Sequence, residues 1–177
     1  MYMGEGMDSG DIIKQSKVEI LDTDTAETLF DKLSKLGSEL LLETLPSIID
    51  GTNERIKQDD SKATYSYNIK PEEEKIDFSK TRREVFNQIR GLNSWPVAHT
   101  YLDGKRLKVW ESRMGNKYDY IEYGIITNIY KDGIGVSTSD GEIILTKIQP
   151  EGKKKMLTSD YLNGISNKNE LLNKKLG

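Results

Sequence analysis

The sequence lacks cysteine entirely, so disulfide bonds and thiolate metal sites are excluded. It has one histidine, His99, and therefore no histidine cluster with metal-binding spacing. It also lacks a phosphate-binding glycine loop, a signal peptide and a long apolar run. These absences predict a cytoplasmic protein that binds neither a metal ion nor a membrane, since a chain without cysteine suits a reducing compartment.

Charge is plentiful but unevenly distributed. Charged residues make up 31% of the 177 residues and hydrophobic residues 35%, which is enough apolar material for one modest core. Residues 1–61 carry 14 acidic and 6 basic side chains, whereas residues 62–177 carry 15 acidic and 20 basic ones. A polyanionic partner is therefore expected to bind the second half of the chain. A solvated lysine-rich surface is the alternative that charge alone leaves open.

Residues 1–51 have the pattern of the end of a βα domain. β-Favouring residues at Met1–Met3 predict a strand that runs into a glycine-punctuated turn. Asp24 is the predicted cap of a helix, which leucines at helical spacing continue as far as a break or kink expected at Gly37. A second helical stretch follows, with Pro46 near a turn.

Residues 52–78 are polar, which predicts an extended linker, and Ser79 is the predicted cap of the helix that follows it. The pattern then changes to strands separated by three Asp-Gly pairs, each of which favours a type I′ hairpin turn. The expected strands are 98–102, 106–113, 123–130, 134–138 and 142–148. Because open edges are unfavourable, residues 79–164 are expected to close into a small barrel, followed by a polar tail at 165–177.

Three segments resemble methionyl-tRNA formyltransferases and follow one another in the order of that family. They are Met7-Asp8-Ser9-Gly10-Asp11-Ile12, Ile89-Arg90-Gly91-Leu92-Asn93-Ser94-Trp95-Pro96 and Leu145-Thr146-Lys147-Ile148-Gln149-Pro150-Glu151-Gly152-Lys153-Lys154. The resemblance implies an α+β chain: the C-terminal tail of a βα formyltransferase domain, then a small antiparallel OB-like β-barrel with a flanking helix. It also implies that most of the transferase domain would precede Met1. We therefore expect an amino-terminally truncated chain, inactive alone or completed by a chain carrying the missing segment.

The resemblance also implies the chemistry of the turn at Asp8. The family transfers a formyl group from 10-formyltetrahydrofolate to the α-amine of initiator methionyl-tRNA, through a tetrahedral oxyanion. It uses an asparagine, a histidine and an aspartate, and by the match Asp8 is the aspartate that orients the histidine. Gly10 would let the backbone approach the folate. The alternative, that turn aspartates only cap backbone amides, is retained for Asp11.

Two other conspicuous side chains are expected to have structural roles. His99 lies at the start of a predicted strand, remote from Asp8 in the layout of the family, and is expected to be a surface or packing residue. Trp95 is expected to pack the helix onto the barrel, and a base-stacking platform is the alternative.

Basic side chains gather on turns and loops of the second half, where lysine contacts phosphates without reading bases. We expect the following to bind tRNA: Arg82, Arg83, Lys105, Arg106, Lys108, Lys153, Lys154 and Lys155. A single such cluster is more often a solvated turn, and it is the family resemblance that favours tRNA. Two alternatives stay open: a non-enzymatic tRNA-binding module, and a related sugar-nucleotide formyltransferase or formyltetrahydrofolate dehydrogenase.

Overall fold

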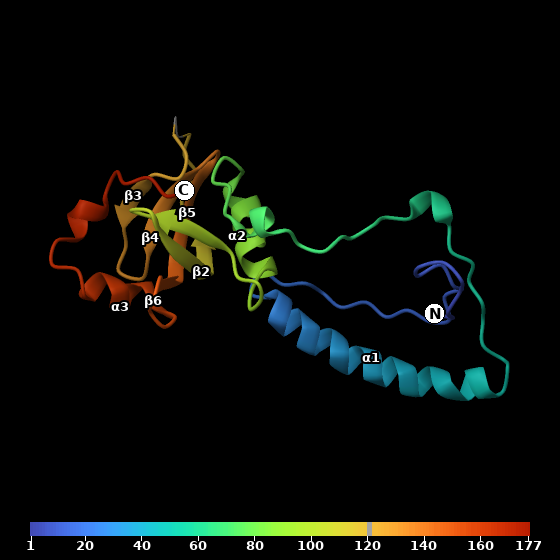
Figure 1. Cartoon of the computed structure of the whole chain (residues 1–177). Helices are drawn as coiled ribbons and strands as arrows, with labels where there is room; N and C mark the ends of the chain where they lie inside the picture. Colours follow the sequence, from blue (N-terminus) through green and yellow to red (C-terminus); the bar gives the residue numbers. More distant parts are fainter. Residues whose placement is uncertain (120–121) are drawn as a thin grey trace. The chain divides into compact units, whose positions relative to one another are not determined.

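The computed structural model describes residues 1–119 and 122–177, and Figure 1 traces the chain. Two units are distinguished, residues 1–68 and 69–177, so the segment expected to be a linker is divided between them. The first unit contains one long helix, the short 3-10 helix η1 (Asp60–Lys62) and irregular chain, whereas the second contains an antiparallel sheet with short helices. This content agrees with the predicted α+β class.

The first unit is built on α1 (Ala26–Ile49), a single helix of 24 residues that Figure 1 shows without interruption. The break predicted at Gly37 is wrong: the helix continues past it and through Pro46. One glycine costs a helix only about 1 kcal/mol, and the residues around this one are good helix formers. The two helical stretches expected from the sequence therefore form one helix.

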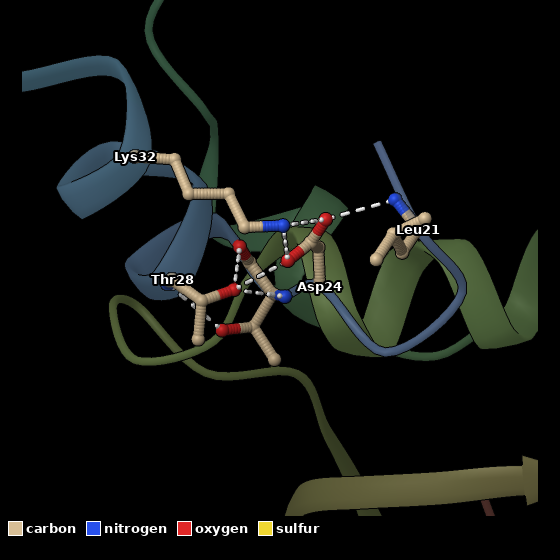
Figure 2. A network of polar contacts seen from close by, with 5 residues as sticks. Leu21, Asp24, Thr28 and Lys32 are labelled. Carbon is tan, nitrogen blue, oxygen red and sulfur yellow. Dashed lines mark hydrogen bonds and ion pairs between the residues drawn. The ribbon is translucent and has the colours of Figure 1, made fainter. Parts of the chain in front are cut away.

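The entry to α1 is held by Asp24, which precedes the cap instead of forming it (Figure 2). The N-cap is Thr25, which shares a capping box with Thr28. The Asp24 carboxylate accepts hydrogen bonds from the Leu21 backbone N–H (2.8 Å) and the Thr28 hydroxyl (3.2 Å), and pairs with Lys32 Nζ (2.7 Å). The hydrogen bond from Lys32, followed by that from Leu21, lowers the pKa of Asp24.

The segment before α1 forms loops in place of the predicted strand at Met1–Met3. The Tyr2 backbone N–H donates to the Asp11 carbonyl (2.9 Å), and Ile12 forms a single antiparallel bridge with Ile56. A strand needs a neighbour along its length to pair its backbone groups. Within the described residues this bridge is the only pairing near the start of the chain, so the strand prediction is wrong.

The second unit contains α2 (Arg82–Gly91), whose N-cap is Thr81 in a capping box with Glu84. The predicted cap at Ser79 is wrong, because its backbone N–H and its hydroxyl both bond to Asp77 Oδ1, at 3.0 and 2.6 Å. The chain therefore makes a short aspartate turn before the helix begins.

The sheet follows the order β1-β2-β5-β4-β3, with β6 paired to β5, and every pairing is antiparallel. Its strands are β1 (His99–Leu102), β2 (Lys105–Met114), β3 (Ile126–Ile129), β4 (Ile134–Thr138), β5 (Gly141–Pro150) and β6 (Met156–Leu157). Each Asp-Gly pair joins two strands, so the three predicted hairpins are confirmed. Only Asp103-Gly104 has both φ angles positive (52° and 74°), as a type I′ turn requires.

The last residues pack against the sheet and are not the separate polar tail that was expected at 165–177. Leu171 and Leu176 are buried. The Lys174 carbonyl accepts from the backbone N–H that begins β3 (2.9 Å), and the Gly177 N–H donates to a carbonyl of β1 (3.1 Å). Strands β1 and β3 share no ladder among the described residues, so this segment borders both edges of a curled sheet.

The core of the second unit lies between the sheet and its short helices. Two of these elements, η2 (Pro71–Glu74) and α2, precede the sheet, and two follow it, α3 (Thr158–Asn163) and η3 (Lys168–Leu171). The almost fully buried apolar members are Val85, Ile89, Val109, Ile126, Ile134, Val136, Ile143, Leu145, Ile148 and Leu162. In the described parts of the chain, no helix combines the length and apolar character needed to cross a membrane.

Candidate functional site

The turn at residues 8–11, called the Asp8 turn below, is held in place by Gln58. The Gln58 side-chain amide donates to the carbonyl oxygens of Asp8 and Gly10, at 2.7 Å each. Asp8 has a φ of 52°, in the left-handed region that aspartate and asparagine tolerate better than most residues. Nothing in the polar stretch around Gln58 distinguishes it in the sequence, so its role is revealed only by the fold.

Gly10 is required by the turn itself. A Cβ atom at this position would lie 1.8 Å from the Tyr2 carbonyl oxygen, which is far inside van der Waals contact. The same close approach lets the Tyr2 N–H reach the Asp11 carbonyl at 2.9 Å. Gly10 therefore permits one backbone segment of this chain to approach another, and its predicted proximity to the folate stays a prediction.

Ser9 is the side chain of the Asp8 turn that stabilises it, since its hydroxyl donates to the Gly6 carbonyl (3.1 Å), whereas the two carboxylates do not. Neither the Asp8 nor the Asp11 carboxylate accepts a hydrogen bond from the described residues, so the amide-capping role retained for Asp11 has no support. Asp8 is exposed. No three histidine, aspartate or glutamate side chains within the described ranges gather as a metal site would require. The turn therefore presents the Asp8 carboxylate without a hydrogen-bond partner among the described residues, on a backbone that Gln58 holds in place.

His99 has the packing role expected of it. It is buried in β1, where Arg106 Nη2 lies 3.1 Å from its Nδ1 atom and 3.2 Å from Glu74 Oε2. Burial, and then the positive charge of Arg106, lowers the pKa of His99. A neutral ring that accepts from an arginine in the core is poorly suited to act as a base at the Asp8 turn.

Two of the eight predicted tRNA-contacting side chains are occupied within the second unit. Arg82 Nη1 donates to the Gly115 carbonyl (2.6 Å), and the Arg82 backbone N–H donates to Asp140 Oδ1 (2.7 Å). Arg106 pairs with Glu74, as described above. These two arginines hold α2 and η2 against the sheet, so their contribution to an RNA interface is reduced.

The other six differ in what surrounds them. Arg83 and Lys155 lie over aromatic rings, at 5.6 Å from the ring centroid of Phe86 and 4.6 Å from that of Trp110. Five predicted lysines have no ion-pair partner among the residues described: Lys105, Lys108, Lys153, Lys154 and Lys155. The structure therefore leaves lysines, rather than arginines, as the open cations of this surface.

A cavity of about 310 Å³ brings some of these cations together. Lys105 and Arg106, at the start of β2, line it from one side, and Lys153, after β5, lines it from another. Tyr161 of α3 also lines it, and burial raises the pKa of this tyrosine. Asp103 and Glu151 line the same cavity, so its lining combines cations, carboxylates and a phenol.

The packing role predicted for Trp95 is wrong. Its side chain is 82% exposed, although the residues around it, Asn93 and Val97, are buried. An apolar residue beside a proline turn gives no indication in the sequence of which way its ring points. The alternative role, a platform for stacking, is the one that remains.

Sequence reasoning also misses Glu142, a carboxylate in β5 that is fully buried. It accepts hydrogen bonds from the Thr127 hydroxyl, Asn128 Nδ2 (2.8 Å) and the Tyr130 hydroxyl (2.6 Å). Room for it is made by Gly135, where a Cβ atom would lie 2.1 Å from Glu142 Oε1. Alternation along a predicted strand cannot show that three donors of β3 and the turn after it converge on one acidic side chain.

Comparison with protein families adds two matches in chain order. The family described as "Formyl transferase" matches residues 1–45, and "Formyl transferase, C-terminal domain" matches residues 68–166. The Asp8 turn lies in the first match, and the sheet and most of the basic residues lie in the second.

Individual proteins resemble the chain over nearly all of its length. It is 49% identical over 165 residues to a methionyl-tRNA formyltransferase of Bacillus licheniformis, covering 93% of this chain and 52% of that protein. It is 46% identical over 177 residues to one of Staphylococcus aureus, covering 99% and 56%. The chain thus spans about half the length of these curated relatives.

A solved structure has the same fold. An N-formyltransferase from Helicobacter canadensis, crystallised with folinic acid and dTDP-3-aminofucose, superimposes with a TM-score of 0.61 at 27% identity. The match covers 84% of this chain and 53% of that one.

Proposed function

This chain belongs to the formyl transferase family, and we propose that it supplies the aspartate turn and the tRNA-binding region of a methionyl-tRNA formyltransferase. The observation that carries the proposal is its identity of 46% to 49% with curated methionyl-tRNA formyltransferases over at least 93% of its length. The reaction is formyl transfer from 10-formyltetrahydrofolate to the α-amine of initiator methionyl-tRNA. A charged tRNA as substrate would place it in the cytoplasm.

The proposed chemistry needs a proton acceptor near the attacking amine. Its nitrogen bonds to the formyl carbon, and the carbonyl π pair moves to oxygen to form a tetrahedral oxyanion. When the carbonyl re-forms, the bond to N10 of the folate breaks and N10 takes up a proton, while the amine gives one up. In this scheme Asp8 acts by a hydrogen bond to the histidine that receives the amine proton.

The geometry of the Asp8 turn supports this role. The Asp8 carboxylate is exposed and uses none of its hydrogen-bonding capacity within the described residues, while Gln58 and Gly10 fix the backbone beneath it. A carboxylate of this kind is available to orient a neighbouring imidazole. His99 is not that imidazole, because it is buried in β1 and bonded to Arg106.

The second unit would bind the tRNA through its phosphates. Its open cations are lysines on turns, which act as point charges and do not read bases. We propose that the curled sheet serves as an OB-like barrel in this binding, with residues 173–177 completing its wall between β1 and β3.

A chimera tests the function directly. The amino-terminal part of the Staphylococcus aureus relative, up to the start of its match, is fused upstream of Met1. The product is assayed for formylation of methionyl-tRNA with 10-formyltetrahydrofolate as donor. The proposal expects turnover by the chimera and none by the 177-residue chain alone. A folded chimera that binds the folate but never formylates the tRNA would refute the proposal.

The resemblance to a sugar N-formyltransferase supplies the second candidate, an enzyme that formylates an amino sugar of a sugar nucleotide. The same chimera distinguishes the two when it is offered dTDP-3-aminofucose in place of methionyl-tRNA. Preference for the sugar nucleotide would overturn the tRNA assignment. If no amine is formylated and tRNA still binds, the remaining alternative is a non-enzymatic tRNA-binding module.

A further inference from the structure

Trp95 is exposed on a turn whose neighbours are firmly fixed. Asn93 is buried, and its Nδ2 atom donates to the Trp110 carbonyl (2.7 Å). Val97 is buried, and its backbone N–H donates to the Leu92 carbonyl (2.9 Å). The φ of Val97 is 77°, a conformation that β-branched residues avoid unless packing imposes it. The turn therefore holds an indole in solvent on a backbone that is determined on both sides.

Trp110 of β2 connects this turn to the loop that carries Lys153, Lys154 and Lys155, which is called the lysine loop below. Trp110 lies at a bulge in β2, where the pairing with β5 shifts register between Val109 and Glu111. Its indole N–H donates to Gln149 Oε1 (3.1 Å), and the Gln149 amide donates to the Lys153 carbonyl (3.0 Å). Bulges commonly redirect side chains near functional sites.

Lysines complete this surface. Lys155 Nζ lies 4.6 Å from the centroid of the Trp110 ring, and Lys153 and Lys154 are exposed without ion-pair partners among the described residues. Trp110 thus has the turn of Trp95 bonded to its backbone and the lysine loop over its ring. We call Trp95, Trp110 and residues 153–155 the tryptophan–lysine surface.

We propose that Trp95 stacks on an unpaired base of a bound RNA strand whose phosphates contact the lysines at 153–155. The inference rests on the proposed function, because it assumes that the second unit binds RNA. An aromatic ring beside lysines is the combination that single-stranded nucleic acids use, since every base has a stacking face and every nucleotide a phosphate. The occupant is RNA rather than an apolar protein surface because residues 153–155, which hydrogen bonds through Trp110 join to the turn of Trp95, are lysines without an ion-pair partner among the described residues.

Fluorescence reports the contact, because Trp95 and Trp110 are the only two tryptophans. The variant Trp110→Phe keeps a ring beneath Lys155 and leaves Trp95 as the sole indole. Two probes are used with the 177-residue chain: a blunt RNA duplex, which offers phosphates without unpaired bases, and a single-stranded oligoadenylate. Stacking predicts that oligoadenylate quenches Trp95 emission, whereas the duplex binds at low salt with little quenching.

Affinity in the otherwise unaltered chain gives an independent readout. Trp95→Ala should weaken oligoadenylate binding about 5- to 150-fold, as loss of one stacked base predicts, with an unchanged dependence on salt. Trp95→Phe should recover part of the loss. Lys154→Ala should weaken both probes and make the salt dependence shallower. The matched control is Phe30→Ala, which removes an aromatic ring that is 74% exposed on the acidic first unit and should change neither affinity.

The outcomes distinguish failure of base stacking by Trp95 from failure of RNA binding by the second unit. If both probes bind but Trp95 is not quenched and Trp95→Ala has the affinity of the parent, stacking is overturned and phosphate binding stands. If oligoadenylate quenches Trp95 and the duplex does not bind, stacking stands and recognition of paired tRNA regions is overturned. If neither probe binds at low salt, both are overturned.

Discussion

Removing the Glu142 carboxylate should destabilise the second unit by an amount that depends on which side chain replaces it. Glu142 is fully buried and accepts from Thr127, Asn128 and Tyr130. In Glu142→Gln, the amide oxygen can face Thr127 and Asn128, and the Tyr130 hydroxyl can rotate to accept from the amide nitrogen. In Glu142→Ala, all three donors lose their acceptor.

The expected costs follow from the exposure of those donors. The Asn128 amide is at the surface and can bond to water, whereas Thr127 and Tyr130 are half-buried. Glu142→Ala removes hydrogen bonds from two half-buried donors, at about 1–2 kcal/mol each, so its expected cost is about 2–4 kcal/mol. Glu142→Gln keeps its partners and loses only the charge assistance, so we expect about 1 kcal/mol.

Urea unfolding followed by tryptophan emission measures this, because both tryptophans lie in residues 69–177 and report on the second unit alone. The matched control is Glu111→Ala, which removes an exposed glutamate paired with Lys147 at 2.8 Å and should cost less than about 1 kcal/mol. The denaturant midpoint should fall in the order parent, Gln, Ala, with an unchanged slope. Equal stability of Glu142→Ala and the parent would refute the idea that the buried network stabilises the fold.

Two further predictions concern the first unit and pH. Gly10→Ala should disrupt the Asp8 turn, because a Cβ would lie 1.8 Å from the Tyr2 carbonyl oxygen. Gly37→Ala has open space around it and should stabilise α1 by about 1 kcal/mol. Hydrogen exchange should therefore become faster in residues 1–12 of the first variant and slower in α1 of the second. Burial and Arg106 lower the pKa of His99 in the folded protein, so the unfolded chain takes up the proton first as pH falls below about 6.5. Stability should therefore decrease from about pH 7 to pH 5, and His99→Gln should flatten that decrease in urea titrations; an unchanged slope would contradict the assignment.

Local patterns predict the sheet well because its signals are chemical and short-range. Asp103-Gly104 needs two positive φ angles that few other pairs supply, so the hairpin follows from the sequence. The other two Asp-Gly pairs also join strands, but their turns lack this conformation, because the surrounding strands set the connection. The break predicted at Gly37 is wrong because the low helix propensity of one glycine costs little in a continuous helix of 24 residues.

The candidate site is only partly predictable because long-range contacts complete it. Asp8 and Gly10 follow from a local motif, whereas Gln58, which holds their carbonyls, is about 50 residues away in a polar stretch without a pattern. Likewise, the sequence cannot show that Arg106 is engaged by Glu74 while Lys153 stays open. Trp95 has the same local sequence whether its ring packs or is exposed, and only the buried contacts of its neighbours determine which occurs.

The most direct test of the central claim compares two carboxylates of the same turn in the formylating chimera. Asp8→Asn keeps a side chain that tolerates the φ of 52° at this position and removes only the negative charge. Asp11→Asn is the matched control, since its carboxylate also has no partner among the described residues. Asp8→Asn should lower kcat about 10²- to 10⁴-fold, as loss of proton-transfer assistance does, whereas Asp11→Asn should leave kcat unchanged. Equal rates for the two variants, or an undiminished rate for Asp8→Asn, would contradict the central claim.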